Sequence, residues 1–310
     1  MKEVEPTHSV SFCSMNNGNP IVLDVEAIYQ EKRMNRKFKN WLNHGGKLSL
    51  EDFGSNTMKD RKEIWGIVEE YRVQCYEKAK SRYMNSDFAE TIREIRSKKG
   101  KKKIRIQTSK GVVERDPVIV FTRPFYDFAT WYTYSWSDEL IQESSKKALV
   151  IDLGLELANR KNLETVFAEL SPQIYVHYGH GSPHSMIGQG GRDNILIDDD
   201  NCDILHNCQV YSVACHTARH LGEVAIKKGC IVWMGYNEDF RFVTKFNALD
   251  VRLRKIFELL RKKGEVTLED MSKITHDIRM LIVRCLEHNR DSLKLVGDGS
   301  ARTLDWRNLS

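Results

Sequence analysis

The spacing of apolar residues divides the chain into a helical first part and a second part in which short apolar runs alternate with helices. Residues 24–42 and 60–83 place apolar side chains three and four positions apart, for example Ile64, Val68 and Tyr71, which predicts amphipathic helices. From residue 117 onward, β-branched runs of five to seven residues recur with helical periods between them. The predicted strands are 117–121, 148–153, 173–179, 209–214 and 230–236, and the predicted helices between them are 137–147, 160–170 and 217–229.

Strands that alternate with helices at this spacing form βαβ units, and their nearly continuous apolar character indicates burial on both faces. The sequence therefore predicts an α/β fold, a three-layer sandwich with a mainly parallel central sheet, preceded by a mostly helical N-terminal region. Two further helices, at 248–260 and 266–286, are expected to complete the packing of the sheet or to form a small cap. The expected domains are a basic, mostly helical region at 1–112, the α/β domain at 113–290 and a loosely held tail at 291–310.

Bulk composition is that of a soluble globular protein, with 41% hydrophobic and 29% charged residues. No apolar run approaches the roughly 18 residues that span a membrane, and the first residues do not resemble a secretory signal. The seven cysteines have no regular spacing, which favours reduced thiols over a disulfide framework. These features predict a cytoplasmic protein with no membrane partner.

The positive charge is concentrated near the N-terminus. Residues 1–116 hold 24 Lys and Arg against 17 Asp and Glu, a net +7, whereas the remainder is net −2. The excess peaks at 96–111, which includes the Lys98–Lys103 run. Such a run is suited to nucleic acid or an acidic partner, but a solvated linker or hairpin edge is the stronger expectation because no aromatic residues interleave with the lysines.

Two reactive side chains follow directly after predicted strands. His180 comes after strand 173–179, and Cys215 comes after strand 209–214. Because sites in parallel sheets form beyond the carboxyl ends of the strands, we expect the imidazole and the thiol to meet there. Cys215 is also expected at the start of a helix, whose dipole favours a thiolate. The main-chain N–H groups of Gly181 and Cys215 are natural donors to the oxyanion of acyl transfer.

The blocks "YGHG" and "SVACHTA" resemble the His-Gly and Ala-Cys blocks of the clan CD cysteine peptidases, which have the caspase–haemoglobinase fold. The resemblance covers roughly residues 117–285 and is closest to the CHAT group of separase-like, prokaryotic caspase-like proteases. It implies a thiol protease with His180 as general base and acid and Cys215 as nucleophile, without metal or organic cofactor. It also implies regulated, narrow specificity for one protein substrate. The N-terminal region would then dock an activating protein or nucleoprotein partner.

Two positions depart from the CHAT pattern, because Val213 and His216 flank the Ala-Cys pair where Ser and Glu are usual. The residue preference at the scissile bond is therefore left open by the sequence. Three acidic residues near the same sheet edge are candidates to line a pocket for a basic side chain, with the last of them favoured, although each also suits an ordinary strand-end or turn position: Asp152, Glu238 and Asp239.

Other polar residues have structural interpretations. His177 is expected to belong to the scaffold and His184 to a loop surface. A zinc site built from Cys202, His206 and Cys208 with His216 or His220 is possible in principle, but the spacing lacks a close cysteine pair.

Residues 182–203 are expected to form a flexible loop, with a substrate-facing or self-processing role as the alternative. The acidic run 198–200 within it has the chemistry to hold a hard cation weakly.

A second class of function competes with the peptidase. A catalytically silent adaptor with the same fold could bind nucleic acid or protein through its basic N-terminal region. Labelling of Cys215 by an electrophilic peptide distinguishes the two, because only the peptidase needs a reactive thiol.

Overall fold

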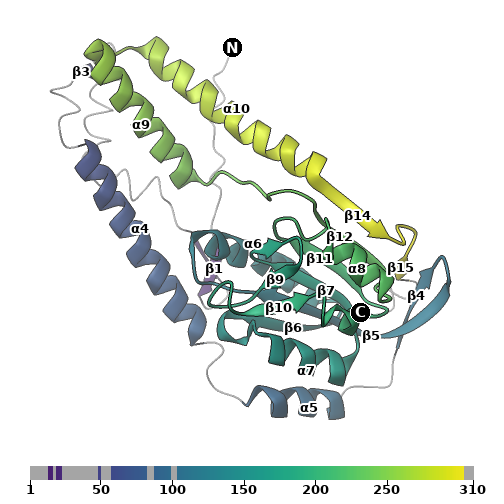
Figure 1. The fold of residues 1–310 in the computed structure, drawn as a ribbon. Coiled ribbons are helices and arrows are strands. Elements are labelled where there is room, and N and C mark those ends of the chain that lie inside the picture. The colour runs from purple at the N-terminus through teal and green to yellow at the C-terminus, as the bar shows by residue number, and fades with distance from the viewer. Residues whose placement is uncertain are drawn as a thin grey trace. The chain divides into compact units, whose positions relative to one another are not determined.

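The computed structural model describes residues 13–16, 19–22, 48–49, 57–81, 87–98 and 103–303, and Figure 1 shows its helices and strands. The chain forms two compact units. The first comprises residues 1–73 and 241–288, and the second comprises residues 74–240 and 289–310. The helix predicted at 24–42 and residues 99–102 of the basic run lie outside the described residues.

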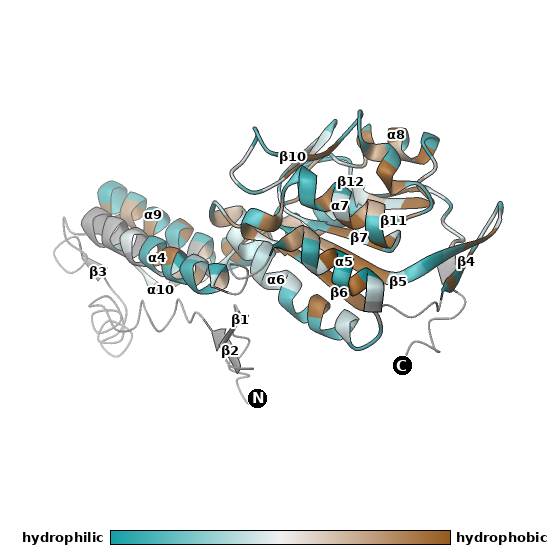
Figure 2. Cartoon of the chain, turned by 90° about the horizontal axis from the view of Figure 1, so that it is seen from below, coloured by the Kyte–Doolittle hydropathy of each residue, from teal (hydrophilic) through white to brown (hydrophobic). Residues whose placement is uncertain are grey.

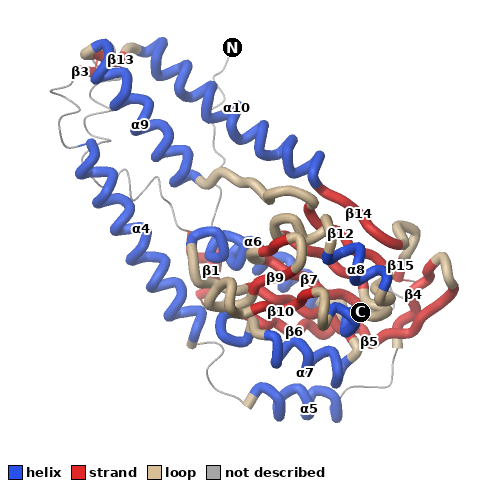
Figure 3. The backbone as a smooth tube through the Cα atoms, in the orientation of Figure 1, coloured by secondary structure: helices blue, strands red, loops and turns tan. Residues whose placement is uncertain are grey.

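The second unit is built around an eight-stranded sheet (Figure 3), in the order β14-β12-β11-β7-β5-β4-β15, with β6 paired to β5. The strands β12, β11, β7, β5 and β6 run parallel, whereas β14, β4 and β15 pair antiparallel. The strands are β4 (Ile104–Thr108), β5 (Gly111–Arg123), β6 (Leu149–Gly154), β7 (Pro172–Tyr178), β11 (Gln209–Val213), β12 (Val232–Tyr236), β14 (Leu293–Gly297) and β15 (Arg302–Thr303).

Alternating residues of the strands face opposite layers. Val118 and Val120 of β5 pack toward α5 (Phe88–Lys98), α7 (Arg160–Leu170) and α8 (Leu221–Lys227). Ile119 and Phe121 face the other way, in a cluster that includes Ile141 of α6 (Phe128–Ser145). In Figure 2, β5 changes from hydrophilic in the part that pairs with β4 to hydrophobic where it enters the sheet. The expected α/β sandwich with a mainly parallel sheet is confirmed.

The segment after β7 is more ordered than the flexible loop expected at 182–203. It forms a small sheet of β8 (Gly181–Ser182), β9 (Ser185–Ile187) and β10 (Ile195–Asp198), followed by a 3-10 turn at Cys202–Leu205. Another 3-10 turn, Leu155–Leu157, follows β6. The boundaries also differ from the expected tail at 291–310, because residues 293–297 form β14 and pair with β12 along its whole length.

The first unit contains the two long helices near the C-terminus, α9 (Lys245–Lys263) and α10 (Leu268–Ser292, to residue 288). Their apolar stripes pack together through residues such as Ile256, Leu260 and Ile274. These helices therefore group with the N-terminal unit rather than with the sheet, whereas the sequence left open whether they complete the packing of the sheet or form a small cap. The unit also holds α4 (Thr57–Lys80, to residue 73), β1 (Cys13–Asn16), β2 (Asn19–Val22), β3 (Leu48–Ser49) and β13 (Glu265–Val266).

None of the described helices combines the length and the apolarity that crossing a lipid bilayer requires.

Candidate active site

The segments that carry His180 and Cys215 lie side by side beyond the carboxyl ends of β7 and β11. The two strands are parallel neighbours with Tyr178 opposite Val213. Just beyond, the N–H of Gly179 donates to the carbonyl of Val213 at 3.2 Å. A Cβ placed on Gly181 would lie only 2.8 Å from the main-chain oxygen of Cys215. The residues on both sides of His180 therefore contact the Cys215 segment, and glycine at 181 permits this approach.

Asp127 holds the imidazole of His180. Its Oδ2 lies 2.7 Å from His180 Nε2, and its Oδ1 accepts from the N–H and the hydroxyl of Thr130, each at 2.8 Å. Asp127 is the N-cap of α6. Its capping box with Thr130 holds the carboxylate in the orientation in which it contacts His180. One side chain thus begins a helix and orients the candidate base.

The Asp127 contact decides which nitrogen of His180 carries a proton. Burial acts to raise the pKa of Asp127, but the bonds from His180 and Thr130 outweigh it and bring the pKa to about 2. An ionised carboxylate only accepts hydrogen bonds, so Nε2 of His180 is the protonated nitrogen. Nδ1 then carries the lone pair, and it is the nitrogen suited to take a proton from a thiol.

His177 supports the main chain of His180 from within the core. It is fully buried, and burial lowers its pKa to about 4, so the imidazole is neutral at pH 7. Its Nε2 lies 3.1 Å from the carbonyl oxygen of His180, and because a carbonyl only accepts, Nε2 carries the proton. Nδ1 then accepts from the Thr122 hydroxyl at 2.9 Å, and Thr122 accepts from the hydroxyl of Tyr175 at 2.8 Å.

This buried chain also orients the peptide bond between His180 and Gly181. The His180 carbonyl accepts from His177 and from the N–H of Ile187, which lies at 3.0 Å. Two donors on one carbonyl fix the plane of its peptide group, and in a trans peptide the N–H points away from the C=O. The direction of the Gly181 N–H, a predicted oxyanion donor, is therefore set by His177 and Ile187.

Cys215 lies in a turn rather than at the start of a helix. The next helix, α8, begins only at Leu221, which differs from the expected helix start at the cysteine. Burial raises the pKa of the thiol above its ordinary value of 9.0; the N–H of Phe240, 3.3 Å from Sγ, opposes this rise, and the charge of Asp239 adds to it. The expectation of a lowered pKa is wrong, because the dipole of α8 is too distant to offset burial. The resting group is a thiol.

His216 gives the turn its shape. Its φ is +60°, in the left-handed region that non-glycine residues rarely adopt. Its N–H donates to the carbonyl of Glu238 at 3.0 Å, and its Nε2 lies 2.8 Å from Oδ1 of Asp239. The turn that holds Cys215 is thereby tied to the segment after β12, which brings two predicted pocket residues to the thiol's side of the sheet.

The three predicted pocket acids differ in their surroundings. Glu238 and Asp239 are exposed, and the charge of Asp239 acts on the Cys215 thiol. Asp152 lies within β6, where both of its carboxylate oxygens accept from the Arg123 guanidinium at 2.6 and 2.7 Å. Arg123 is nearly buried and also pairs with Asp138 of α6. The pocket role of all three stays a prediction, and the exposed pair has the more suitable location.

The side chains that could bind a metal ion together are a different group from the one considered in the sequence. Within the described residues, the group of three or more such side chains is His184, Asp199 and His220. It shares His220 with the set considered in the sequence but includes none of Cys202, His206 and Cys208. Six cysteines are free thiols: Cys75, Cys202, Cys208, Cys215, Cys230 and Cys285.

Asp127 is the site residue that the sequence did not reveal, whereas His177 lies in the buried scaffold as expected. The spacing Asp127-x-x-Thr130 before an apolar helical stretch is a signal for a helix cap. It does not indicate that the same carboxylate meets a histidine 53 residues later. That contact depends on the pairing of β5 with β7, which places the start of α6 beside the end of β7.

Comparison with known proteins adds a distant structural neighbour. No protein-family model matches the chain, and no curated protein matches it. The chain is similar to the solved structure of gingipain R, described as an Arg-specific cysteine proteinase, with 14% sequence identity and a TM-score of 0.36. The match covers 59% of this chain and 46% of the gingipain R chain, so the chain matches less than half of that protein's length.

Proposed function

We propose that the chain is a cysteine endopeptidase with a His180–Cys215 dyad and with Asp127 as the residue that orients His180. The observation that carries the proposal is the Asp127–His180 contact beside the Cys215 turn. An ionised carboxylate on Nε2 leaves Nδ1 as a base at the carboxyl ends of two adjacent parallel strands. The caspase-like character and the CHAT grouping rest on the resemblance of the two sequence blocks.

In the proposed reaction, Nδ1 of His180 takes the Cys215 proton as Sγ attacks the peptide carbonyl. The carbonyl oxygen becomes an oxyanion, which the N–H groups of Gly181 and Cys215 stabilise. His180 then gives the proton to the leaving amine as the C–N bond breaks, which leaves an acyl-enzyme. A water molecule, deprotonated by His180, releases the acid and restores the thiol. A raised thiol pKa favours this general-base route over a preformed ion pair.

The substrate is proposed to be a partner protein cut after a basic residue. Asp239 supports this preference, because its exposed carboxylate lies where its charge acts on Cys215. A bound Lys or Arg side chain would neutralise that charge and so make the thiol easier to ionise. We propose narrow specificity on the same ground, since a substrate that lacks the cation leaves the Asp239 charge to oppose the loss of the thiol proton. In keeping with the resemblance, we also propose that an activating partner docks on the N-terminal region and that the protein is cytoplasmic.

Active-site labelling tests the function. The full chain is treated with a peptide acyloxymethyl ketone that carries Arg next to the warhead, and the extent and the position of modification are measured by mass spectrometry. We expect labelling of the parent, none of Cys215→Ala, and a rate reduced about a hundredfold in His180→Ala. Cys285→Ala is the matched control, because it removes another partly buried thiol. Equal labelling of all four proteins would refute the dyad and favour the silent adaptor.

A further inference from the structure

Three side chains outside the dyad converge on one point of the second unit. His184 lies in the turn between β8 and β9, Asp199 follows β10, and His220 precedes α8. Oδ2 of Asp199 lies 2.9 Å from Nδ1 of His184 and 3.1 Å from Nε2 of His220. The ligand atoms of all three lie within 4.8 Å of one another.

The second oxygen of Asp199 is an independent sign of a ligand. Among the described residues, no donor reaches Oδ1 of Asp199, although this atom is buried from solvent. A buried carboxylate oxygen without a donor is costly, and a cation would compensate it. The Asp199 side chain as a whole is 39% exposed, so water can complete the coordination of an ion held there.

The spacing suits a tetrahedral metal with nitrogen and oxygen ligands. Zinc bonds of about 2.0–2.1 Å place neighbouring ligand atoms roughly 3.3 Å apart. The observed 2.9 and 3.1 Å need to open by only a few tenths of an ångström to admit the ion. Two imidazoles and one carboxylate favour zinc and similar transition metals over calcium or magnesium, which prefer oxygen ligands.

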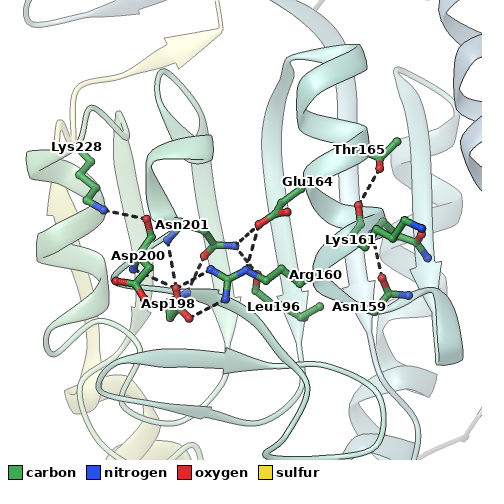
Figure 4. Close-up of polar contacts among 11 residues, drawn as sticks. Asn159, Arg160, Lys161, Glu164, Thr165, Leu196, Asp198, Asp200, Asn201 and Lys228 are labelled. Atoms are coloured by element: carbon green, nitrogen blue, oxygen red, sulfur yellow. Dashed lines mark hydrogen bonds and ion pairs between the residues drawn. The ribbon is translucent and has the colours of Figure 1, made fainter.

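Neighbouring charges are already engaged in ways that keep the Asp199 carboxylate directed at the histidines. Arg160 binds both carboxylate oxygens of Asp198 at 2.9 and 3.0 Å. Lys228 donates to the main-chain oxygens of Asp199 and Asp200 at 2.5 and 3.3 Å, rather than to the Asp199 carboxylate. Figure 4 shows Arg160 directed at Asp198 and the Lys228 ammonium at this acidic turn. The turn is therefore held in place by its neighbours.

We propose that His184, Asp199 and His220 bind one zinc ion, which joins the two segments of the active site. His184 belongs to the hairpin that begins with Gly181, and His220 ends the turn that begins at Cys215. One hydrogen bond already links these segments, from the N–H of Leu221 to the carbonyl of Pro183 at 2.8 Å. A shared metal ion strengthens that link. The binding stands on its own residues, whereas its effect on labelling rests on the proposed function.

Zinc binding is measured by calorimetry on the full chain in the Cys215→Ala background, which removes the catalytic thiol as a competing ligand. We expect one zinc ion per chain, with affinity weakened in His184→Ala, His220→Ala and Asp199→Asn by at least the roughly tenfold to hundredfold that the loss of an outer-shell partner costs. His276→Ala, on an exposed position of α10, is the matched control and should bind as the background does. Unchanged affinity in His184→Ala or His220→Ala overturns the assignment.

Cobalt substitution gives a second readout that does not depend on the folding of the His184, Asp199 and His220 variants. Co²⁺ in the Cys215→Ala protein should show the visible bands of a tetrahedral ion without a thiolate charge-transfer band, because the proposed ligands contain no sulfur. A thiolate band would place the metal on cysteines and refute the site.

Labelling of the parent in the presence of a chelator then tests the coupling of the metal to the dyad. We expect labelling to slow when zinc is removed and to recover when it is restored. If the chelator removes zinc and the rate of labelling stays the same, the coupling is refuted but the metal site is not. Zinc binding in a chain that is never labelled would leave the metal site in place and count against the peptidase.

Discussion

Oδ2 of Asp127 lies 2.7 Å from Nε2 of His180 while Oδ1 of the same carboxylate caps α6. The two functions can be separated by substitution. Asn keeps an oxygen for the cap but loses the charge, whereas Ala removes both. We expect Asp127→Asn to retain most of the stability and to reduce the rate of Cys215 labelling about 10- to 100-fold, because Nε2 of His180 is no longer held protonated by an anion.

Asp127→Ala should lose activity to the same extent and also about 1 kcal/mol of unfolding free energy. The matched control is Asn159→Ala, which removes the N-cap of α7, where Asn159 accepts from the N–H of Asn162 and donates to the carbonyl of Glu156. This variant should lose stability and keep its labelling rate. Loss of labelling in Asn159→Ala comparable to that in Asp127→Asn would show that any disturbed helix start suffices.

Acid destabilisation should reveal the neutral, buried His177. Its pKa falls from an ordinary 6.5 to about 4 in the folded chain, whereas the unfolded chain binds a proton near 6.5. The unfolded state therefore binds more protons between these values, and stability is lost as the pH falls from about 6.5 to about 4, by about 3 kcal/mol in all. Denaturant unfolding across this range should show that slope in the parent and lose it in His177→Gln. A slope that persists in His177→Gln would contradict a neutral His177.

His177→Gln and His177→Phe together test how His177 acts on catalysis. Gln can still donate to the His180 carbonyl, whereas Phe cannot, so His177→Phe should weaken binding of a peptide aldehyde about tenfold more than binding of the matching peptide amide. Only the aldehyde adduct places an oxyanion against the Gly181 N–H. Equal losses for both ligands would indicate that His177 has a structural function only.

Gly181 should tolerate no side chain. A Cβ there would lie 2.5 Å from Cγ2 of Thr217 as well as 2.8 Å from the Cys215 carbonyl oxygen. We expect Gly181→Ala to lower the melting temperature and to reduce labelling, because the His180 and Cys215 segments must move apart. Thr217→Ser removes Cγ2 and keeps the hydroxyl that donates to Ser212 at 2.9 Å. The double variant should recover part of both losses, and no recovery would show that Thr217 is not the obstacle.

The strand ends were predictable from the sequence because apolar runs stop abruptly at His180 and Cys215. The alternation with helices also indicated that their strands are parallel. The cap residue Asp127 was not found, since its contact with His180 depends on the order of strands in the sheet, which periodicity does not determine. The direction of the thiol pKa shift was predicted wrongly, because residues 216–220 form a turn that separates Cys215 from Leu221, where α8 begins. Burial of Cys215 depends on packing with the segment that holds Phe240, a long-range contact.

Asp239 should control both the ionisation of Cys215 and the choice of substrate. Its carboxylate is one cause of the raised thiol pKa, so Asp239→Asn should lower that pKa and let iodoacetamide react with Cys215 at a lower pH than in the parent. The same change should abolish a preference for Arg over Gln in the labelling peptide, by about tenfold or more. Glu238→Gln and Asp152→Asn are the matched controls, and Arg123 already binds the Asp152 carboxylate. If the preference for Arg is instead lost in Glu238→Gln, the basic side chain binds to that residue. If the three variants keep the parent's preference, the pocket for the substrate side chain lies elsewhere.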